Sequence, residues 1–338
     1  MGMILKVWMN TMAVITMLSQ SPTAHANKSI AENIKYLARN QPYEAIKEYE
    51  KIASKLLTQD SPETILIYKD VLISASSTQN MKLIEQMVDL LSAPRLEPYI
   101  TPYLFVVTNA IGVAYRRNGQ LDDAIATYKC TFKYAFNDID KMTVKVNLAI
   151  AYRMMQQPAI SFQLLQSIDE AILNGNRKAG LLVVKGNTAV VLGKAGDAVR
   201  YFSEARNYYL KVQHKRSAAR VTVNLLGAAL ISRKLDIFDH YRSKLVKLPD
   251  DYLPESDLEY LAWLDLMHQS VIKNSMTADI ISYTIQHVPK LIEYGYTEHV
   301  AQLLESLEAG DLVPKIAEVA PPEIKIKNEL GSAWCQDL

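Results

Sequence analysis

Residues 105–138 read FVVTNAIGVAYRRNGQLDDAIATYKCTFKYAFND, two apolar stripes at helical spacing that are separated by a glycine-containing turn. The small residues Gly112 and Ala124 stand where two antiparallel helices would cross closely. Tyr115 and Tyr128 would fill the space beside that crossing. A bulky residue at either small position would force the helices apart. The stretch therefore predicts a helical hairpin.

The same pattern of small and bulky residues recurs along the chain. Ala149 and Gly186 follow Gly112 at successive intervals of 37 residues. A fourth copy places Gly227 another 41 residues on, but it carries Asp239 where a small residue is expected. The sequence therefore predicts an all-α stack of hairpins whose fourth member is degraded.

This pattern resembles the tetratricopeptide repeat, a helical hairpin with a period of roughly 34 residues. The resemblance is clearest over residues 105–247. It implies an all-α, right-handed superhelix of antiparallel helical hairpins, an α-solenoid that binds partners and rarely catalyses. The longer interval in this chain implies that each helix gains part of a turn.

Amphipathic patterns outside the repeats predict further helices, and prolines and glycines mark the boundaries. The expected helical segments are Ile30–Ala53, Pro62–Ala75, Met81–Leu91, Pro254–Lys273, Thr277–Tyr294 and Thr297–Ala309. We expect a bend of the stack in the linker Pro94–Pro102, and a kink or an end of a helix at Pro289. The predicted organisation is 27–93 for N-terminal helical pairs, 94–250 for the repeats, 251–312 for C-terminal helices and 313–338 for an irregular tail. This tail is either disordered or docks onto the last repeat or a partner through Ile324, Ile326 and Trp334.

The first 26 residues resemble a secretory signal peptide. Lys6 precedes the mostly apolar run Val7–Leu18, Pro22 breaks the helix, and Ala24-His25-Ala26 suits cleavage after Ala26. An uncleaved anchor or a first structural helix is the alternative, because polar residues interrupt the apolar run. Cleavage would place the protein in the periplasm of a Gram-negative bacterium, or outside a eukaryotic cell, without stable membrane insertion.

Composition and motifs argue against several function classes. The 338 residues hold 37 Lys and Arg against 36 Asp and Glu, which gives no reason to expect nucleic acid as a partner. Cys130 and Cys335 are too few for a disulfide framework, and two unpaired thiols are favoured over a bridge between them. The chain has no HExxH, CxxC, phosphate-loop or GxSxG motif, so we expect no catalytic residue, no cofactor and no metal. Asp236, Asp239 and His240 would lie on one side of a helix and could offer metal ligands, but we do not expect a metal site there.

The resemblance also implies a partner-binding groove, because the first helix of each repeat lines a concave surface in that family. Transferring the inward positions gives Asn109, Val113 and Arg116, then Val146, Ile150 and Arg153, then Val183, Asn187 and Val190, with Asn224 extending the row. Asparagines, aliphatic patches and two arginines suit an extended segment that carries an acidic group. Alternatively, Arg116 and Arg153 are solvated cations at helix ends. The lysines that clamp a C-terminal carboxylate in some family members are missing, which argues against that ligand.

These observations lead to three hypotheses for function. The first is an exported scaffold or adaptor that binds another envelope protein through the groove, in the assembly of a surface or secretion apparatus. The second is a periplasmic sensor or regulatory input module that acts through a separate signalling protein. The third is a helical-superhelix enzyme acting on polysaccharide, with a carboxylate from the region Asp250–Glu259. The sequence leaves the oligomeric state open.

Overall fold

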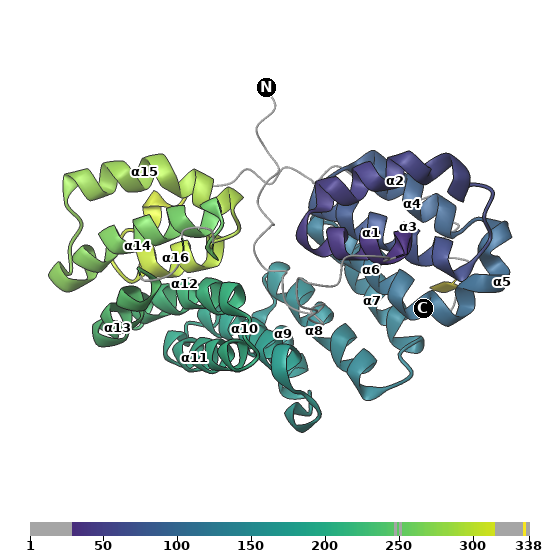
Figure 1. Ribbon diagram of the computed structural model, residues 1–338. Helices are drawn as coiled ribbons and strands as arrows, with labels where there is room; N and C mark the ends of the chain where they lie inside the picture. The colour runs from purple at the N-terminus through teal and green to yellow at the C-terminus, as the bar shows by residue number, and fades with distance from the viewer. Residues whose placement is uncertain (1–28, 247–248, 250–251, 315–333, 336–338) are drawn as a thin grey trace. The chain divides into compact units, whose positions relative to one another are not determined.

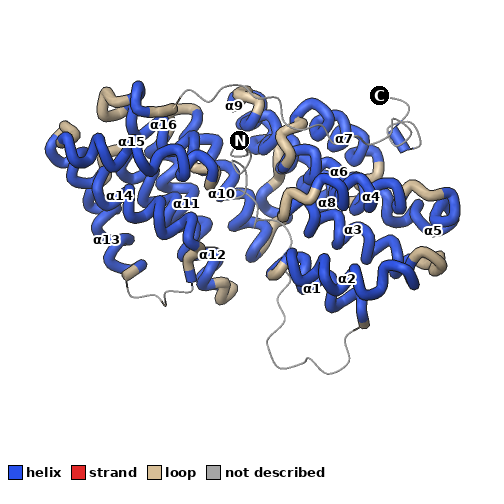
Figure 2. Tube along the Cα trace, turned by 90° about the horizontal axis from the view of Figure 1, so that it is seen from above, coloured by secondary structure: helices blue, strands red, loops and turns tan. Residues whose placement is uncertain are grey.

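The computed structural model describes residues 29–246, 249, 252–314 and 334–335. All regular structure in this part of the chain is helical, as Figure 2 shows, so the predicted all-α class is confirmed. None of the described helices has the length and apolarity that crossing a bilayer requires. The predicted signal peptide, Ile324 and Ile326 lie outside the described residues.

The chain divides between α8 and α9 into two compact units. This division falls within the predicted repeat region 94–250. The N-terminal unit holds α1 to α8 together with Trp334 and Cys335, and the C-terminal unit holds α9 to α16 (Figure 1). The helices of the first are α1 (Ile30–Asn40), α2 (Pro42–Leu56), α3 (Pro62–Ser77), α4 (Met81–Leu91), α5 (Glu97–Ile100), α6 (Leu104–Arg117), α7 (Leu121–Lys133) and α8 (Asp138–Met154). Those of the second are α9 (Pro158–Gln166), α10 (Gly175–Val191), α11 (Ala195–Lys211), α12 (Lys215–Ile231), α13 (Leu235–Leu245), α14 (Glu255–Lys273), α15 (Ala278–Glu293) and α16 (Thr297–Glu305).

Consecutive helices pack against one another in the N-terminal unit. The apolar face of α3 is central, since this helix contacts α1, α2, α4 and α6. Tyr68, Leu72 and Met87 are buried in the shared core. The predicted linker 94–102 is not an open loop, because it folds into two short 3-10 turns with α5 between them.

The expected close crossings occur in two hairpins. A Cβ atom added to Gly112 of α6 would lie 2.5 Å from Cε1 of Tyr128 on α7. A Cβ atom added to Gly186 of α10 would lie 2.7 Å from Cδ1 of Phe202 on α11. Real Cβ atoms do not approach carbon this closely, so only glycine permits either ring to cover the helix. The small-residue pattern therefore predicts these two crossings correctly, but the hairpin expected at Ala149 is wrong, because α8 and α9 belong to different compact units.

The C-terminal unit departs from a simple succession of pairs. Helix α12 contacts α11, α13 and α14, and α16 returns to pack against both α10 and α12. Pro289 lies inside α15, which continues to Glu293, so the predicted end of the helix does not occur there. The carbonyl that Pro289 leaves without a donor belongs to Ile285, an exposed residue, where water can hydrate it.

The two cysteines form a disulfide, so the expectation of unpaired thiols is wrong. The Cα atoms of Cys130 and Cys335 lie 5.5 Å apart, although 205 positions separate them in the chain. Beside the bridge, Trp334 packs against the core of the N-terminal unit, and its carbonyl oxygen accepts a hydrogen bond from the Tyr134 hydroxyl. Trp334 and Cys335 therefore dock on this unit and not on the last repeat. Sequence spacing could not show a pairing over this distance.

Candidate functional site

The predicted groove residues lie on the first helices of the hairpins, in two sets. Helices α6 and α8 carry one set in the N-terminal unit, and α10 and α12 carry the other in the C-terminal unit. Three of these side chains are partly exposed, namely Asn109, Val113 and Asn224. The others are buried, namely Arg116, Val146, Ile150, Arg153, Val183, Asn187 and Val190. The accessible part of the predicted surface is therefore much smaller than the sequence suggests.

Arg116 is part of the first hairpin's interior. Its side chain is 2% exposed, and its Nε donates a hydrogen bond to the Tyr128 hydroxyl at 3.0 Å. Burial raises the pKa of Tyr128, and the Arg116 charge opposes that rise. Arg153 on α8 is equally buried. The interpretation of both arginines as solvated cations is therefore wrong, because both side chains are buried. The Tyr128 ring that covers Gly112 also brings its hydroxyl to Arg116.

Arg117, which the sequence pattern does not single out, joins α6 to α3. Its Nη1 donates to the Ile73 carbonyl at 3.4 Å and to the Ser77 hydroxyl. Burial, with the neighbouring Arg116 charge, lowers the pKa of Arg117 to about 10, so the guanidinium is still protonated at neutral pH. Both arginines lie in the last turn of α6, where the helix dipole favours a cation.

Asn109 is engaged within the N-terminal unit. Its side-chain oxygen accepts a hydrogen bond from Nδ2 of Asn147 on α8 at 2.8 Å. The amide nitrogen of Asn109 donates to no residue that the structure describes, and Val113 follows one helical turn later on α6. These two residues form the accessible part of the α6 face.

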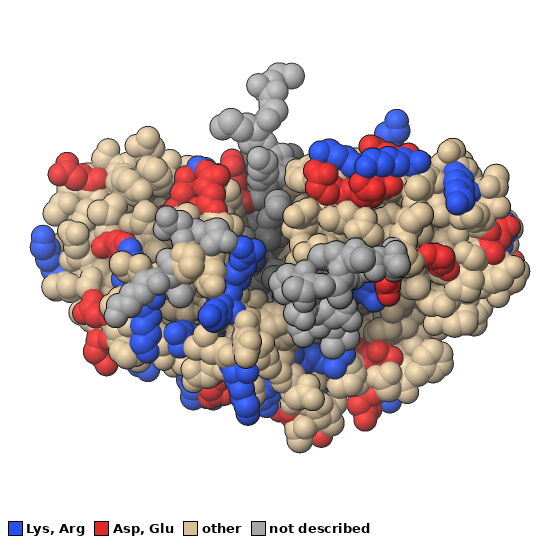
Figure 3. Space-filling model, viewed as in Figure 1, with Lys and Arg blue, Asp and Glu red and all other residues tan. Residues whose placement is uncertain are grey.

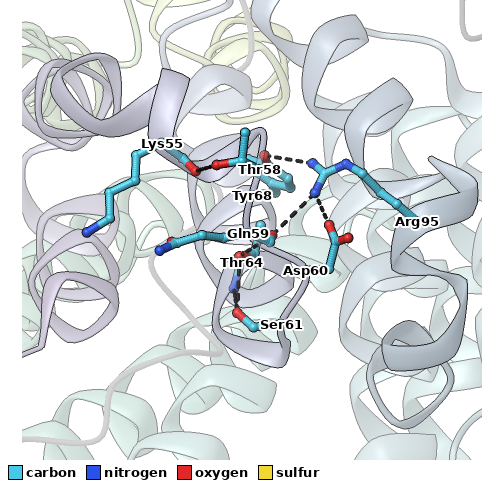
Figure 4. Close-up of polar contacts among 8 residues, drawn as sticks. All are labelled: Lys55, Thr58, Gln59, Asp60, Ser61, Thr64, Tyr68 and Arg95. Atoms are coloured by element: carbon cyan, nitrogen blue, oxygen red, sulfur yellow. Dashed lines mark hydrogen bonds and ion pairs between the residues drawn. The ribbon is translucent and has the colours of Figure 1, made fainter.

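A polar cluster around Arg95 joins the segment after α4 to the α2–α3 loop. Arg95 reaches across to the α2–α3 loop, where its Nη1 donates to the Gln59 carbonyl at 3.3 Å and pairs with Asp60 (Figure 4). Its Nη2 donates to the Tyr68 hydroxyl at 3.2 Å, and Thr64 also donates to the Gln59 carbonyl. Burial raises the pKa of Tyr68, while the Arg95 hydrogen bond opposes that rise. The cluster fixes the α2–α3 loop.

A buried lysine occupies an apolar position of the third hairpin. Lys185 precedes Gly186, where Ile111 and Leu226 precede the corresponding glycines. Its ammonium group pairs with Glu170, which also pairs with Lys178. Burial acts to raise the pKa of Glu170, but the hydrogen bonds from Lys178 and Lys185 outweigh it and lower the pKa. Comparing the repeats position by position would have revealed this exception.

The aspartates proposed for the enzyme hypothesis fall in two places. Asp250 and Asp251 lie outside the described residues. Asp257 lies in the first turn of α14 and is buried, with Arg220 Nε at 3.1 Å and the Tyr296 hydroxyl donating at 2.7 Å. Burial, followed by the Asp257 charge, raises the pKa of Tyr296 well above its ordinary value. These contacts join three segments of the C-terminal unit and occupy both oxygens of Asp257.

The side chains considered for a metal have other contacts. Asp239 faces His268, with 3.4 Å between carboxylate oxygen and Nε2, and His240 Nε2 lies 2.7 Å from the Lys244 ammonium. Within the described ranges, no group of three or more His, Cys, Asp and Glu side chains is arranged to hold a metal ion. Comparison of the chain with protein-family models and with curated protein sequences finds no match.

Proposed function

We propose that this protein is an exported scaffold of tetratricopeptide-like hairpins that binds another envelope protein. The recurring crossing carries this proposal, since Tyr128 and Phe202 each cover a glycine sixteen residues earlier in the chain. Hairpins of this kind stack into preformed surfaces. A rigid surface lowers the ordering cost of binding, because only the partner has to lose conformational freedom.

The exposed part of the α6 face is the favoured contact surface. Val113 offers apolar area, and the Asn109 amide offers donors to the carbonyl groups of an extended partner segment. On α12, Asn224 offers the same chemistry. Helix α10 is less suited, because residues 179–190 are buried on every side and α16 packs against this helix.

Export is supported by the disulfide. Bridges such as Cys130–Cys335 form and persist in oxidising compartments outside the cytosol. The sequence of residues 1–26 agrees with this location. Mass spectrometry of the purified native protein should find Asn27 as the first residue, whereas retention of residues 1–26 would favour the membrane-anchored sensor hypothesis.

Site-specific photocrosslinking tests the contact surface. A photoreactive amino acid at Val113 should give one discrete crosslinked product in cells. The same group at Lys129, an exposed position on the second helix of that hairpin, should give none. Equal products from both positions, or none from either, would contradict binding through the α6 face.

A further inference from the structure

The charges of the C-terminal unit are strongly segregated, although the whole chain is nearly neutral. Residues 175–234, which form α10, α11, α12 and their turns, hold twelve Lys and Arg against two Asp and Glu. Residues 255–312 hold two Lys and ten Asp and Glu. Figure 3 shows Lys and Arg side chains gathered over the part of this unit that α10 to α12 occupy in Figure 1. Counting charge over the whole sequence hides this asymmetry.

One end of these helices concentrates exposed cations. Helix α10 begins where α11 ends and α12 begins, since a Cβ atom on Gly175 would contact Val212 at 3.3 Å and Asn176 Nδ2 lies 3.2 Å from His214 Nε2. Arg177, Lys211 and Lys215 are exposed at this end. We call these three residues the basic edge.

The residues that the structure describes do not neutralise the basic edge. The two acidic residues of this segment, Asp197 and Glu204, both pair with Arg200. Arg177, Lys211 and Lys215 make no ion pair with any residue that the structure describes. Long-range positive potential therefore remains at this end of the unit.

Two of the three cations run against helix electrostatics, whereas Lys211 is the last residue of α11, where the dipole favours a cation. Neither α10 nor α12 has an acidic residue in its first turn or a side chain capping its first N–H groups. Arg177 lies in the first turn of α10, and Lys215 is the first residue of α12. A cation near a helix N-terminus is unfavourable by roughly 0.3–1 kcal/mol, because the dipole is positive there. Such local violations are expected at functional surfaces.

We propose that the basic edge binds an acidic segment of a partner protein. Carboxylates would meet three exposed cations and the positive ends of two helices at once. The same pairing of charges already operates inside the unit, where Arg220 of α12 binds Asp257 of α14 at 3.1 Å. This surface belongs to other helices than the α6 face, so its failure would leave the proposed function intact.

A fluorescent oligoglutamate peptide tests this proposal by anisotropy at low salt. The native protein should bind it, and the triple variant Arg177→Glu, Lys211→Glu, Lys215→Glu should bind at least tenfold more weakly. The control Lys35→Glu, Lys55→Glu, Lys129→Glu changes the net charge equally at exposed positions of the N-terminal unit and should stay within about twofold of native. No binding to the native protein, or equal loss in both variants, would overturn the proposal.

Two further measurements exclude other occupants and misfolding. The first variant should melt close to native, because the gain from acidic residues at the N-termini of α10 and α12 offsets the loss at Lys211, the last residue of α11. A duplex oligonucleotide that binds the basic edge more tightly than oligoglutamate would overturn the choice of a protein partner. Sedimentation that shows a dimer of the native chain, lost in the first variant, would overturn the choice of a different protein as partner and assign the edge to the acidic half of a second copy.

Discussion

The hairpins α10–α11 and α12–α13 both carry a glycine inside their first helix, but different residues cover the two glycines. Gly186 is covered by Phe202, sixteen residues later on the next helix. Sixteen residues after Gly227 stands Ser243, which is exposed, and Gly227 is instead covered by Tyr260 of α14 and by His299 of α16. A missing ring in one hairpin is thus replaced by rings from distant segments.

The difference between these hairpins shows what a small residue determines. Gly227 creates a space beside α12 but does not specify which helix fills it. The Tyr260 ring stacks on Tyr296 at 3.9 Å, and its hydroxyl lies 3.3 Å from His299 Nδ1, so the second closure is an aromatic and polar cluster. Burial raises the pKa of Tyr260 strongly, which keeps its hydroxyl neutral and able to donate. In α10–α11 the glycine is covered by a ring of the next helix, as in α6–α7. In α12–α13 it is covered by residues of α14 and α16, which lie further along the chain.

The largest effect should come from removing the local ring. Phe202→Ala should destabilise the C-terminal unit by about 3–5 kcal/mol, because a fully buried aromatic side chain leaves a cavity. The matched change Ser243→Ala should stay within about 0.5 kcal/mol, since this side chain is exposed. Urea unfolding measures both free energies. Similar losses at the two positions would contradict the difference between the hairpins.

In the hairpin α6–α7, Tyr128 covers Gly112, and Cys130 of α7 is also bonded to Cys335. Cys335→Ser should destabilise the N-terminal unit by about 2–4 kcal/mol, because the disulfide restricts the unfolded chain. Trp334 should also become more exposed, giving red-shifted fluorescence, while its neighbour Tyr134 loses an acceptor. Chemical reduction of the native protein should reproduce both changes. Unchanged fluorescence and stability would show that the tail docks without the bridge.

The next effect tests the space beside each glycine. Gly186→Leu should cost about 1–3 kcal/mol, since the new side chain collides with the Phe202 ring. The double variant Gly186→Leu, Phe202→Ala should lose less stability than the sum of the two single losses, because the leucine then fills part of the cavity. Melting temperatures of the three variants decide this. Additive losses would mean that Gly186 and Phe202 do not share one space.

The smallest effect concerns Lys185, the buried lysine of the hairpin α10–α11. Glu170→Gln should destabilise by about 1–2 kcal/mol at neutral pH, because the ammonium group of Lys185 loses its carboxylate. Glu170 has a lowered pKa when folded, so its contribution is complete above the unfolded value of about 4.3. It disappears as the pH falls through the folded pKa.

Denaturation from neutral to acidic pH measures this contribution. The native protein and Glu170→Gln should converge in stability as the solution becomes acidic. Lys185→Met provides the control, because it replaces the buried charge with an apolar side chain of similar length and should change stability little. A constant difference between native and Glu170→Gln at every pH would exclude the ionised pair as its source.

The candidate surface was less accessible to prediction than the fold. Asn109 and Val113 lie partly exposed on α6, but Arg116, three residues on, is buried. The repeat pattern places each residue on a helix face, whereas its exposure depends on which other segments cover that face. Arg116 finds the hydroxyl of Tyr128, and α16 packs against α10.

The sequence by itself determined the helical class and the crossings at Gly112 and Gly186. Both follow from the spacing of residues in adjacent helices, where a short turn leaves few ways to pack. Only the tertiary structure decided that α16 returns to α12 and that Cys335 bonds to Cys130. These partners are separated by long stretches of chain, so their meeting depends on the path of all the intervening helices and not on any local pattern.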